Sequence, residues 1–206
     1  MIPLGVLGSA RVADDAPGLV ITDSFDRADS TTTLGTTDTG QTWTYHAASG
    51  GSSTWGIRSN AAYKVSGAAY AAALIDLESS DMTAHCDLYA ITGNHYPGVG
   101  VRCTPGTASG YFAWIGTTNR LQLVRRTSTE TQTILAANVA TITYSTWNDV
   151  DISATEEATG TRIRIYLDGV EVASYLDNLT DRPNGTHAGL FSYAGGEFDN
   201  FTAEAL

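Results

Sequence analysis

The sequence is poor in positive charge. Lysine and arginine together number 11 against 22 acidic residues, which leaves a formal net charge of −11. Nucleic-acid binding depends on cationic side chains that displace counterions, so we expect no nucleic-acid partner and no adhesion to anionic lipid. A surplus of negative charge keeps a protein soluble, and that is its simplest meaning here.

Long apolar runs are also missing. No stretch reaches the ~20 residues that a membrane helix needs, so we expect no membrane insertion. The amino terminus has no Lys or Arg before Arg11, and Pro3, Gly5 and Gly8 interrupt its apolar residues. These features are unlike a secretory signal peptide. We therefore expect a chain that is made in a bacterial cytoplasm and is not exported by the usual route.

Cysteine is rare, and helical patterns rich in Lys or Glu are absent. The two cysteines are too few for a disulfide framework or a zinc cluster. Glycine is abundant, and apolar residues recur with a period of two, which favours many short strands joined by turns. The 206 residues fit a single all-β domain.

Residues 1–18 show no periodicity and end in the turn-rich segment Asp14–Gly18. We interpret 1–18 as an extended N-terminal arm and linker, and 19–206 as one folded domain. Such an arm could add a strand to a neighbour's sheet edge; the alternative is a frayed terminus.

Alternation predicts a first strand in which Leu19, Ile21, Asp23 and Phe25 share one face. A polar loop follows over residues 26–42. Further strands are predicted at 60–65, 70–76, 82–91, 98–103, 111–115, 120–125, 131–136, 147–154, 161–167, 170–175, 187–193 and 197–203.

Two hairpins can be assigned a register. Centring one on residues 94–95 places Cys86 opposite Cys103 on the core face, with Arg102 beside Asp87 on the wet face. Centring the other on residues 157–158 sets Ile152 against Ile163 and Asp151 against Arg164. The Asp168–Gly169 pair then predicts a tight turn into the next strand.

Several motifs resemble the concanavalin-A/laminin-G-like superfamily. They are the strand Trp147–Ile152 with the hairpin Ile165–Val172, the terminal segments Asp23–Phe25 and Phe198–Phe201, and the central segments Gly98–Arg102 and Gly110–Trp114. The resemblance implies a two-sheet antiparallel jelly-roll sandwich. This fold hosts lectins, hydrolases, lyases and adhesion modules, so it does not by itself choose a function.

A narrower resemblance concerns residues 4–12 and 23–30. Both segments are similar to minor tail (tail-associated) proteins of phages that infect actinobacteria. The resemblance implies a structural protein of the virion, located in the phage tail or its host-facing tip, with a lectin-like domain. It also implies contact with other virion proteins through the N-terminal arm, a homo-oligomer, and binding to host cell-envelope glycan.

Catalysis is not expected, and we assign no catalytic residue. Retaining glucanases need two carboxylates about 5 Å apart. On a strand this calls for acids at alternate positions, typically three of them, as in E-x-D-x-E. Asp149 and Asp151 lack a third acid. Lyases of this fold gather Arg, Tyr and His on one sheet face, and our register places His85, Tyr89 and Arg102 together, which keeps a lyase as an alternative.

A structural calcium ion is the one cofactor that we expect. Alternation places Asp23 and Asp199 beside core residues at the meeting of the terminal strands, and buried like charges call for a cation or hydrogen bonds. Oxygen ligands alone suit Ca²⁺, and related jelly rolls often hold Ca²⁺ at this place. The alternatives are that Arg27 neutralises the pair or that both acids lie at wet strand ends.

Trp55, His95 and Tyr96 are the expected ligand-binding residues, because we expect them to lie in exposed loops. Sugar rings have C–H faces that suit aromatic side chains, although most Trp residues of a sandwich fill its core. The leading hypothesis is thus a phage tail protein with a lectin-like domain. A free bacterial carbohydrate-binding module is the alternative, and a polysaccharide hydrolase or lyase comes third.

Overall fold

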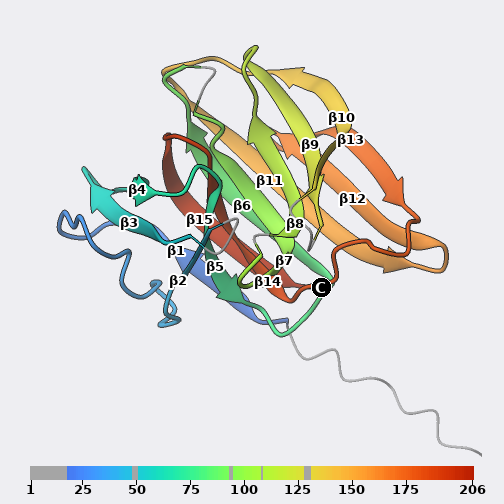
Figure 1. The fold of residues 1–206 in the computed structure, drawn as a ribbon, viewed down its shortest axis with the longest axis horizontal. Helices are drawn as coiled ribbons and strands as arrows, with labels where there is room; N and C mark the ends of the chain where they lie inside the picture. The colour runs from blue at the N-terminus through green and yellow to red at the C-terminus, as the bar shows by residue number, and fades with distance from the viewer. Residues whose placement is uncertain (1–17, 48–50, 93–94, 108, 128–130) are drawn as a thin grey trace, which may run out of the picture.

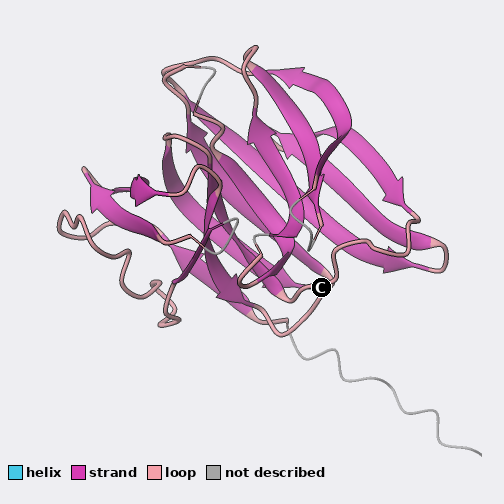
Figure 2. Ribbon diagram, in the orientation of Figure 1, coloured by secondary structure: helices cyan, strands magenta, loops and turns pink. Residues whose placement is uncertain are grey.

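The computed structural model describes residues 18–206 except 48–50, 93–94, 108 and 128–130. Within these residues the chain forms 15 strands. Figure 2 shows strands and loops and no helix in this part of the chain. No helix that is long and apolar enough to cross a membrane occurs in this part of the chain. The all-β prediction is confirmed.

The strands form two antiparallel sheets, which lie one behind the other in Figure 1. The eight-stranded sheet has the order β13 (Val170–Asp177), β12 (Gly160–Leu167), β11 (Trp147–Glu157), β6 (Met82–Tyr89), β15 (Glu197–Ala205), β4 (Ala61–Gly67) and β3 (Ser53–Arg58), and β1 (Val20–Asp23) also pairs with β15. The seven-stranded sheet has the order β10 (Gln132–Thr141), β9 (Arg120–Arg126), β8 (Ser109–Ile115), β7 (Gly98–Thr104), β14 (His187–Ser192), β5 (Ala71–Asp76) and β2 (Thr44–Ala47).

The main core fills the space between the sheets. In β6, and in β11 from Val150 to Ala154, every second side chain is apolar and wholly buried, as Cys86, Leu88 and Ile152 illustrate. Their neighbours in sequence are polar and face outward, which is the usual arrangement of an antiparallel sheet with one wet face. The two-sheet sandwich therefore agrees with the jelly-roll prediction.

The predicted pairing of Cys86 with Cys103 is wrong. β6 pairs with β11 and β15, while β7 belongs to the other sheet. Both thiols are free and buried, but Cys86 lies in the main core and Cys103 lies in a second apolar cluster. Alternation reports which side of a strand is buried, and it does not report which strand lies alongside.

The hairpin of β11 and β12 forms as expected, with its register shifted by two residues. Ile152 lies opposite Ile165, and Asp151 lies opposite Tyr166 rather than Arg164. A shift of two keeps every side chain on its predicted face. At the next turn Asp168 and Gly169 have φ angles of 51° and 73°, which suit a two-residue hairpin turn and confirm that prediction.

Arg102 is not on a wet face. It has a φ angle of 51° at an irregularity between Val101 and Thr104, where β7 loses its regular pairing with β8. The side chain is 1% exposed and crosses to the other sheet, where its guanidinium donates to Glu156 (2.9 Å) and Thr161 (2.8 Å). The predicted pair with Asp87 does not form because β6 and β7 lie in different sheets. The extra residue in β7 reverses the alternation locally and turns Arg102 inward.

Candidate functional site

The outer face of the eight-stranded sheet is polar and open. Along its centre, β15, β6 and β11 present Asp199, Asp87 and Asp149 in one row, because Asp87 lies opposite both of the others. We call these three side chains the aspartate row. Like charges directly opposite each other on neighbouring strands are destabilising, so a row of this kind is unusual for a surface that only needs to be soluble.

The electrostatics of the row reflect this crowding. Partial burial raises the pKa of the Asp149 carboxyl above its usual range, and the neighbouring carboxylates Asp151 and Asp87 add to the effect. Partial burial also raises the pKa of Asp199, and Asp87 again contributes. Asn200 donates an amide hydrogen bond to Asp87 at 2.8 Å. Partial burial and mutual repulsion therefore both disfavour the ionised forms of Asp149 and Asp199.

His85 lies one step along the same face. Its Nδ1 is 3.2 Å from Asp151 Oδ1 and 3.4 Å from Asp149 Oδ1. The hydrogen bond to Asp151 and the surrounding carboxylates raise the pKa of His85, although partial burial opposes them. The three side chains bring their ligand atoms within 4.8 Å of one another, and no other group of three among the described residues does so. They could hold a metal ion, but the imidazole already bridges the two carboxylates.

An aromatic pair stands beside the row. Trp147 and Tyr89 lie opposite each other on β11 and β6, with ring centroids 5.2 Å apart. Trp147 is 44% exposed, which is unusual for an indole on a face otherwise made of polar side chains. Because alternate residues of a strand are about 7 Å apart, the rings adjoin the aspartate row directly.

At the other end of this face lies a cavity of about 460 Å³. Its lining includes Asp151, Ser153, Arg164 and Tyr166, all from β11 and β12. The surface therefore runs from an aromatic pair, over carboxylates and His85, to a hollow with hydroxyl and guanidinium groups. We call this continuous surface the acidic face. Sequence reasoning did not assign it, although the alternation Trp147, Asp149, Asp151 was a signal for it.

The prediction that Trp55 is an exposed ligand-binding residue is wrong. Trp55 lies in β3, is 0% exposed and packs against Phe198 with ring centroids 5.6 Å apart. Its Nε1 has no hydrogen-bond partner among the described residues. The Ser- and Gly-rich sequence before β3 resembles a loop, but the apolar face of this strand completes the core.

His95 and Tyr96 lie elsewhere. Both are half-buried, and the Tyr96 ring packs against Trp114 (5.5 Å) and Tyr193 (5.4 Å) on the outer side of the seven-stranded sheet. Tyr70 joins them, 4.8 Å from Tyr193. We call Tyr70, Tyr96 and Tyr193 the tyrosine cluster. The structure does not bring Trp55 to it, and a sugar-binding role for His95 and Tyr96 stays a prediction.

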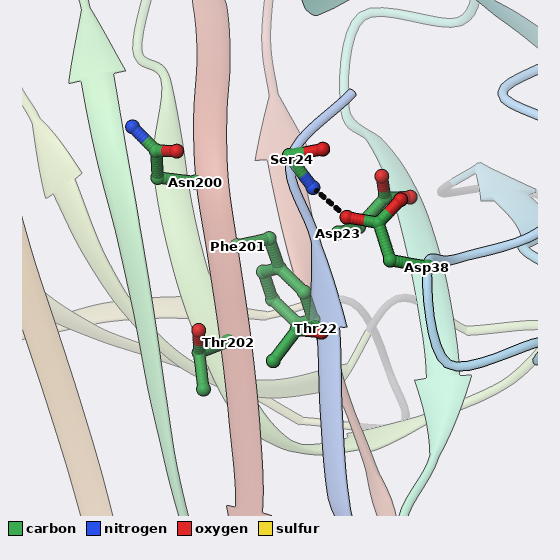
Figure 3. A pocket seen from close by; sticks show the side chains of 7 residues that line it. All are labelled: Thr22, Asp23, Ser24, Asp38, Asn200, Phe201 and Thr202. Atoms are coloured by element: carbon green, nitrogen blue, oxygen red, sulfur yellow. Dashed lines mark hydrogen bonds between the residues drawn. The ribbon is translucent and has the colours of Figure 1, made fainter. Parts of the chain in front are cut away.

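Asp23 lies where β1 meets β15, beside a cleft of about 150 Å³ (Figure 3). The carboxylate is 1% exposed, and burial raises its pKa. It accepts hydrogen bonds from Trp43 Nε1 (2.7 Å) and from the backbone N–H of Phe25 (2.9 Å), and it pairs with Arg27. Protein donors thus satisfy both oxygens.

Asp199 faces the other way. Phe198 and Phe201 are both in the core although they are three residues apart, because an irregularity at Asn200 (φ 50°) adds a residue to β15. Asp199 therefore joins the outer row and not the core side of Asp23. With a guanidinium already at Asp23 and with Asp199 turned away, these two residues do not fit a shared calcium ion. Arg27 pairs with Asp23, which agrees with the alternative for that residue, but no ion pair joins Arg27 to Asp199 among the described residues.

Comparisons with known proteins come from structure. The sequence matches no protein-family model, and no curated protein is significantly similar to it. Carbohydrate-binding module CBM66 from Bacillus subtilis has a TM-score of 0.57 and 18% identity, over 78% of this chain and 98% of that one. Domain 4 of AbnA, a GH43 extracellular arabinanase from Geobacillus stearothermophilus, in complex with arabinotriose, has a TM-score of 0.53 and 13% identity, over 92% of this chain and 94% of that one.

A third structure, the GH43 protein BlXynB from Bacillus licheniformis, has a TM-score of 0.54 and 13% identity. The match covers 90% of this chain and 39% of that larger chain. At such identities the likeness shows the fold alone. The fold is that of a β-sandwich found in carbohydrate-binding modules and in domains of glycoside hydrolases, in agreement with a concanavalin-A-like architecture.

Proposed function

We propose that this protein is a carbohydrate-binding module that binds glycan on its acidic face. The observation that carries the proposal is Trp147, an exposed indole backed by Tyr89 and adjoining a row of hydrogen-bonding carboxylates. A sugar ring can stack its C–H face on the indole while its hydroxyls donate to the neighbouring carboxylates. The shared fold of carbohydrate-binding modules supports the same role.

The test is binding to a panel of soluble polysaccharides, measured by affinity electrophoresis and calorimetry. Losing the contact area of one indole is expected to cost about 1.5–3 kcal/mol, so Trp147→Ala should weaken binding roughly tenfold or more. Ile134→Ala removes a side chain of similar exposure (47%) from the other sheet and should leave binding unchanged. If Tyr193→Ala abolishes binding and Trp147→Ala does not, the site is the tyrosine cluster and the proposal is wrong.

We further propose that the module binds without catalysis. The Asp149 and Asp151 carboxylates are close enough to resemble a retaining pair. However, His85 Nδ1 lies 3.2 Å from Asp151 and 3.4 Å from Asp149, so the imidazole already engages both carboxylates. Incubation with glucans, arabinogalactan and uronate polymers should release neither reducing ends nor unsaturated products. Turnover that disappears in Asp149→Asn would overturn this proposal.

We also propose, more specifically, that the protein is a component of a phage tail. This proposal is supported by the resemblance of residues 4–12 and 23–30 to phage minor tail proteins, and part of that sequence lies outside the described residues. In this proposal the arm, residues 1–18, attaches the domain to other tail proteins as part of a homo-oligomer, and the acidic face meets host-envelope glycan. Mass spectrometry of purified particles tests it: the chain should be present, and a version lacking residues 2–13 should be absent.

A further inference from the structure

The aspartate row has no strong cationic partner. Among the described residues, the ion pairs join no Arg or Lys to Asp87, Asp149 or Asp199, and His85 is the one basic group that reaches the row. Two arginines of the same sheet pair with other acids, Arg58 with Glu197 and Arg164 with Glu171. A charge row that the protein itself leaves uncompensated can be compensated by a ligand.

The chemistry of the row also defines what a ligand must offer. Ionised carboxylates only accept hydrogen bonds, so the matching groups are hydroxyls and, more strongly, ammonium groups, which form charge-assisted bonds. The raised pKa values of Asp149 and Asp199 agree, because partial burial and the neighbouring carboxylates disfavour the charged form of each group, and a cation close by would favour it. A carboxylate or sulfate on the ligand would add to the repulsion.

The geometry places such a group beside the stacking platform. Trp147 and Tyr89 occupy the position two residues before Asp149 and two residues after Asp87, respectively, on paired strands. A ring stacked on the indole would therefore direct its substituents, or those of the next ring, over carboxylates about 7 Å away.

Resting on the proposed glycan-binding function, we propose that the acidic face selects polysaccharides bearing free amino groups over their neutral counterparts, and excludes uronic-acid polymers. The aromatic pair binds the sugar ring, and the aspartate row favours a ligand with positive charge over a neutral or negative one. Both parts of the face are needed for the preference.

The experiment compares two short oligosaccharides with one backbone, an oligomer of β-1,4-linked glucosamine and its N-acetylated form, by calorimetry at low and high salt. The wild-type protein should bind the free amine at least tenfold more tightly at low salt. The advantage should shrink when salt screens the charges. Oligouronates of equal length should not bind.

Variants separate the row from the general attraction of an acidic protein for cations. Asp149→Asn should reduce the preference severalfold, because it should weaken binding of the free amine more than binding of the acetylated oligomer, whereas Trp147→Ala should weaken both by a similar factor. Glu78→Gln removes one exposed acid near the seven-stranded sheet and should change nothing.

The outcomes distinguish the two proposals. If the wild-type protein binds both oligomers equally, prefers the uronate, or loses its preference equally in Glu78→Gln, the specificity proposal is wrong while glycan binding stands. If binding of the free amine requires a divalent cation and is abolished by EDTA, a metal bridge replaces direct contact and again the specificity proposal is wrong. If no glycan of any charge binds, the proposed function itself fails.

Discussion

The outer faces of the two sheets differ in polarity and in burial. The eight-stranded sheet presents the acidic face to solvent, with polar side chains at every second position of β6 and β11. The central strands β7, β8 and β14 of the seven-stranded sheet are buried on both sides. Their outer face carries a second apolar cluster that includes Phe112, Trp114 and Phe191, with Tyr70 and Tyr96 packed against it. In β7 and β8 the buried pattern is almost continuous.

The difference shows how one fold can separate stability from binding. The second apolar cluster is buried, with Tyr70 and Tyr96 packed against it, so it contributes packing to stability. The acidic face contributes little packing, and its repelling carboxylates are tolerated because the other sheet and the core supply the stability. The predictions below test this division, from the largest expected effect to the smallest.

Two tryptophans provide the sharpest contrast. Trp114 is 2% exposed on the covered face, and Trp147 is 44% exposed on the acidic face. Trp114→Ala should lower the free energy of unfolding by about 3–5 kcal/mol, as expected for a large buried aromatic. Trp147→Ala should cost about 1 kcal/mol or less. Urea denaturation measures both, and equal losses would show that the two faces do not differ in this way.

The stability of the acidic face should depend on pH through His85. Because folding raises the pKa of His85, its contribution is fully present below the unfolded value of about 6.5 and is lost as pH rises through the folded value. His85→Gln should therefore cost more stability at pH 5.5 than at pH 8. His46 and His187, whose pKa values burial lowers, titrate in both proteins and cancel in the difference. A pH-independent difference would mean that His85 makes no charged pair with Asp151.

Removing one negative charge from the aspartate row should stabilise the folded protein slightly. Asp199 lies opposite Asp87, so Asp199→Asn should raise the free energy of unfolding by about 0.5 kcal/mol at neutral pH. Asp38→Asn is the matched control, because a hydrogen bond from the Ser24 backbone lowers the pKa of Asp38, and this change should be destabilising. Thermal melts of the two variants should shift in opposite directions. A lower melting temperature for Asp199→Asn would mean that the row is compensated in the free protein.

Removal of metal should have the smallest effect. Since Arg27, Trp43 and the Phe25 amide satisfy Asp23, EDTA should leave the melting temperature unchanged, whereas Arg27→Gln should lower it. A clear fall in melting temperature with EDTA, reversed by added Ca²⁺, would restore the prediction of a calcium ion, since a ligand bound only to the folded state stabilises it.

Much of the strand arrangement could be predicted from local pattern. Alternation located thirteen of the strands close to their observed bounds and identified the inward residues of β6 and β11 correctly. The Asp168–Gly169 turn was predictable because few residues other than Gly, Asn and Asp adopt two successive positive φ angles. Strands β2 and β3 were missed: β2 is only four residues long, and both flank a stretch rich in Ser and Gly.

The sequence by itself determined which residues are buried on regular strands, because a period of two is a property of each strand alone. Only the tertiary structure decided which strands are neighbours, and thereby that Asp87 lies between Asp149 and Asp199. It also decided where an extra residue interrupts the alternation, which turned Arg102 into the interior and Asp199 onto the outer face. Partner choice and irregularities depend on contacts between residues far apart in the chain, and no local pattern contains that information.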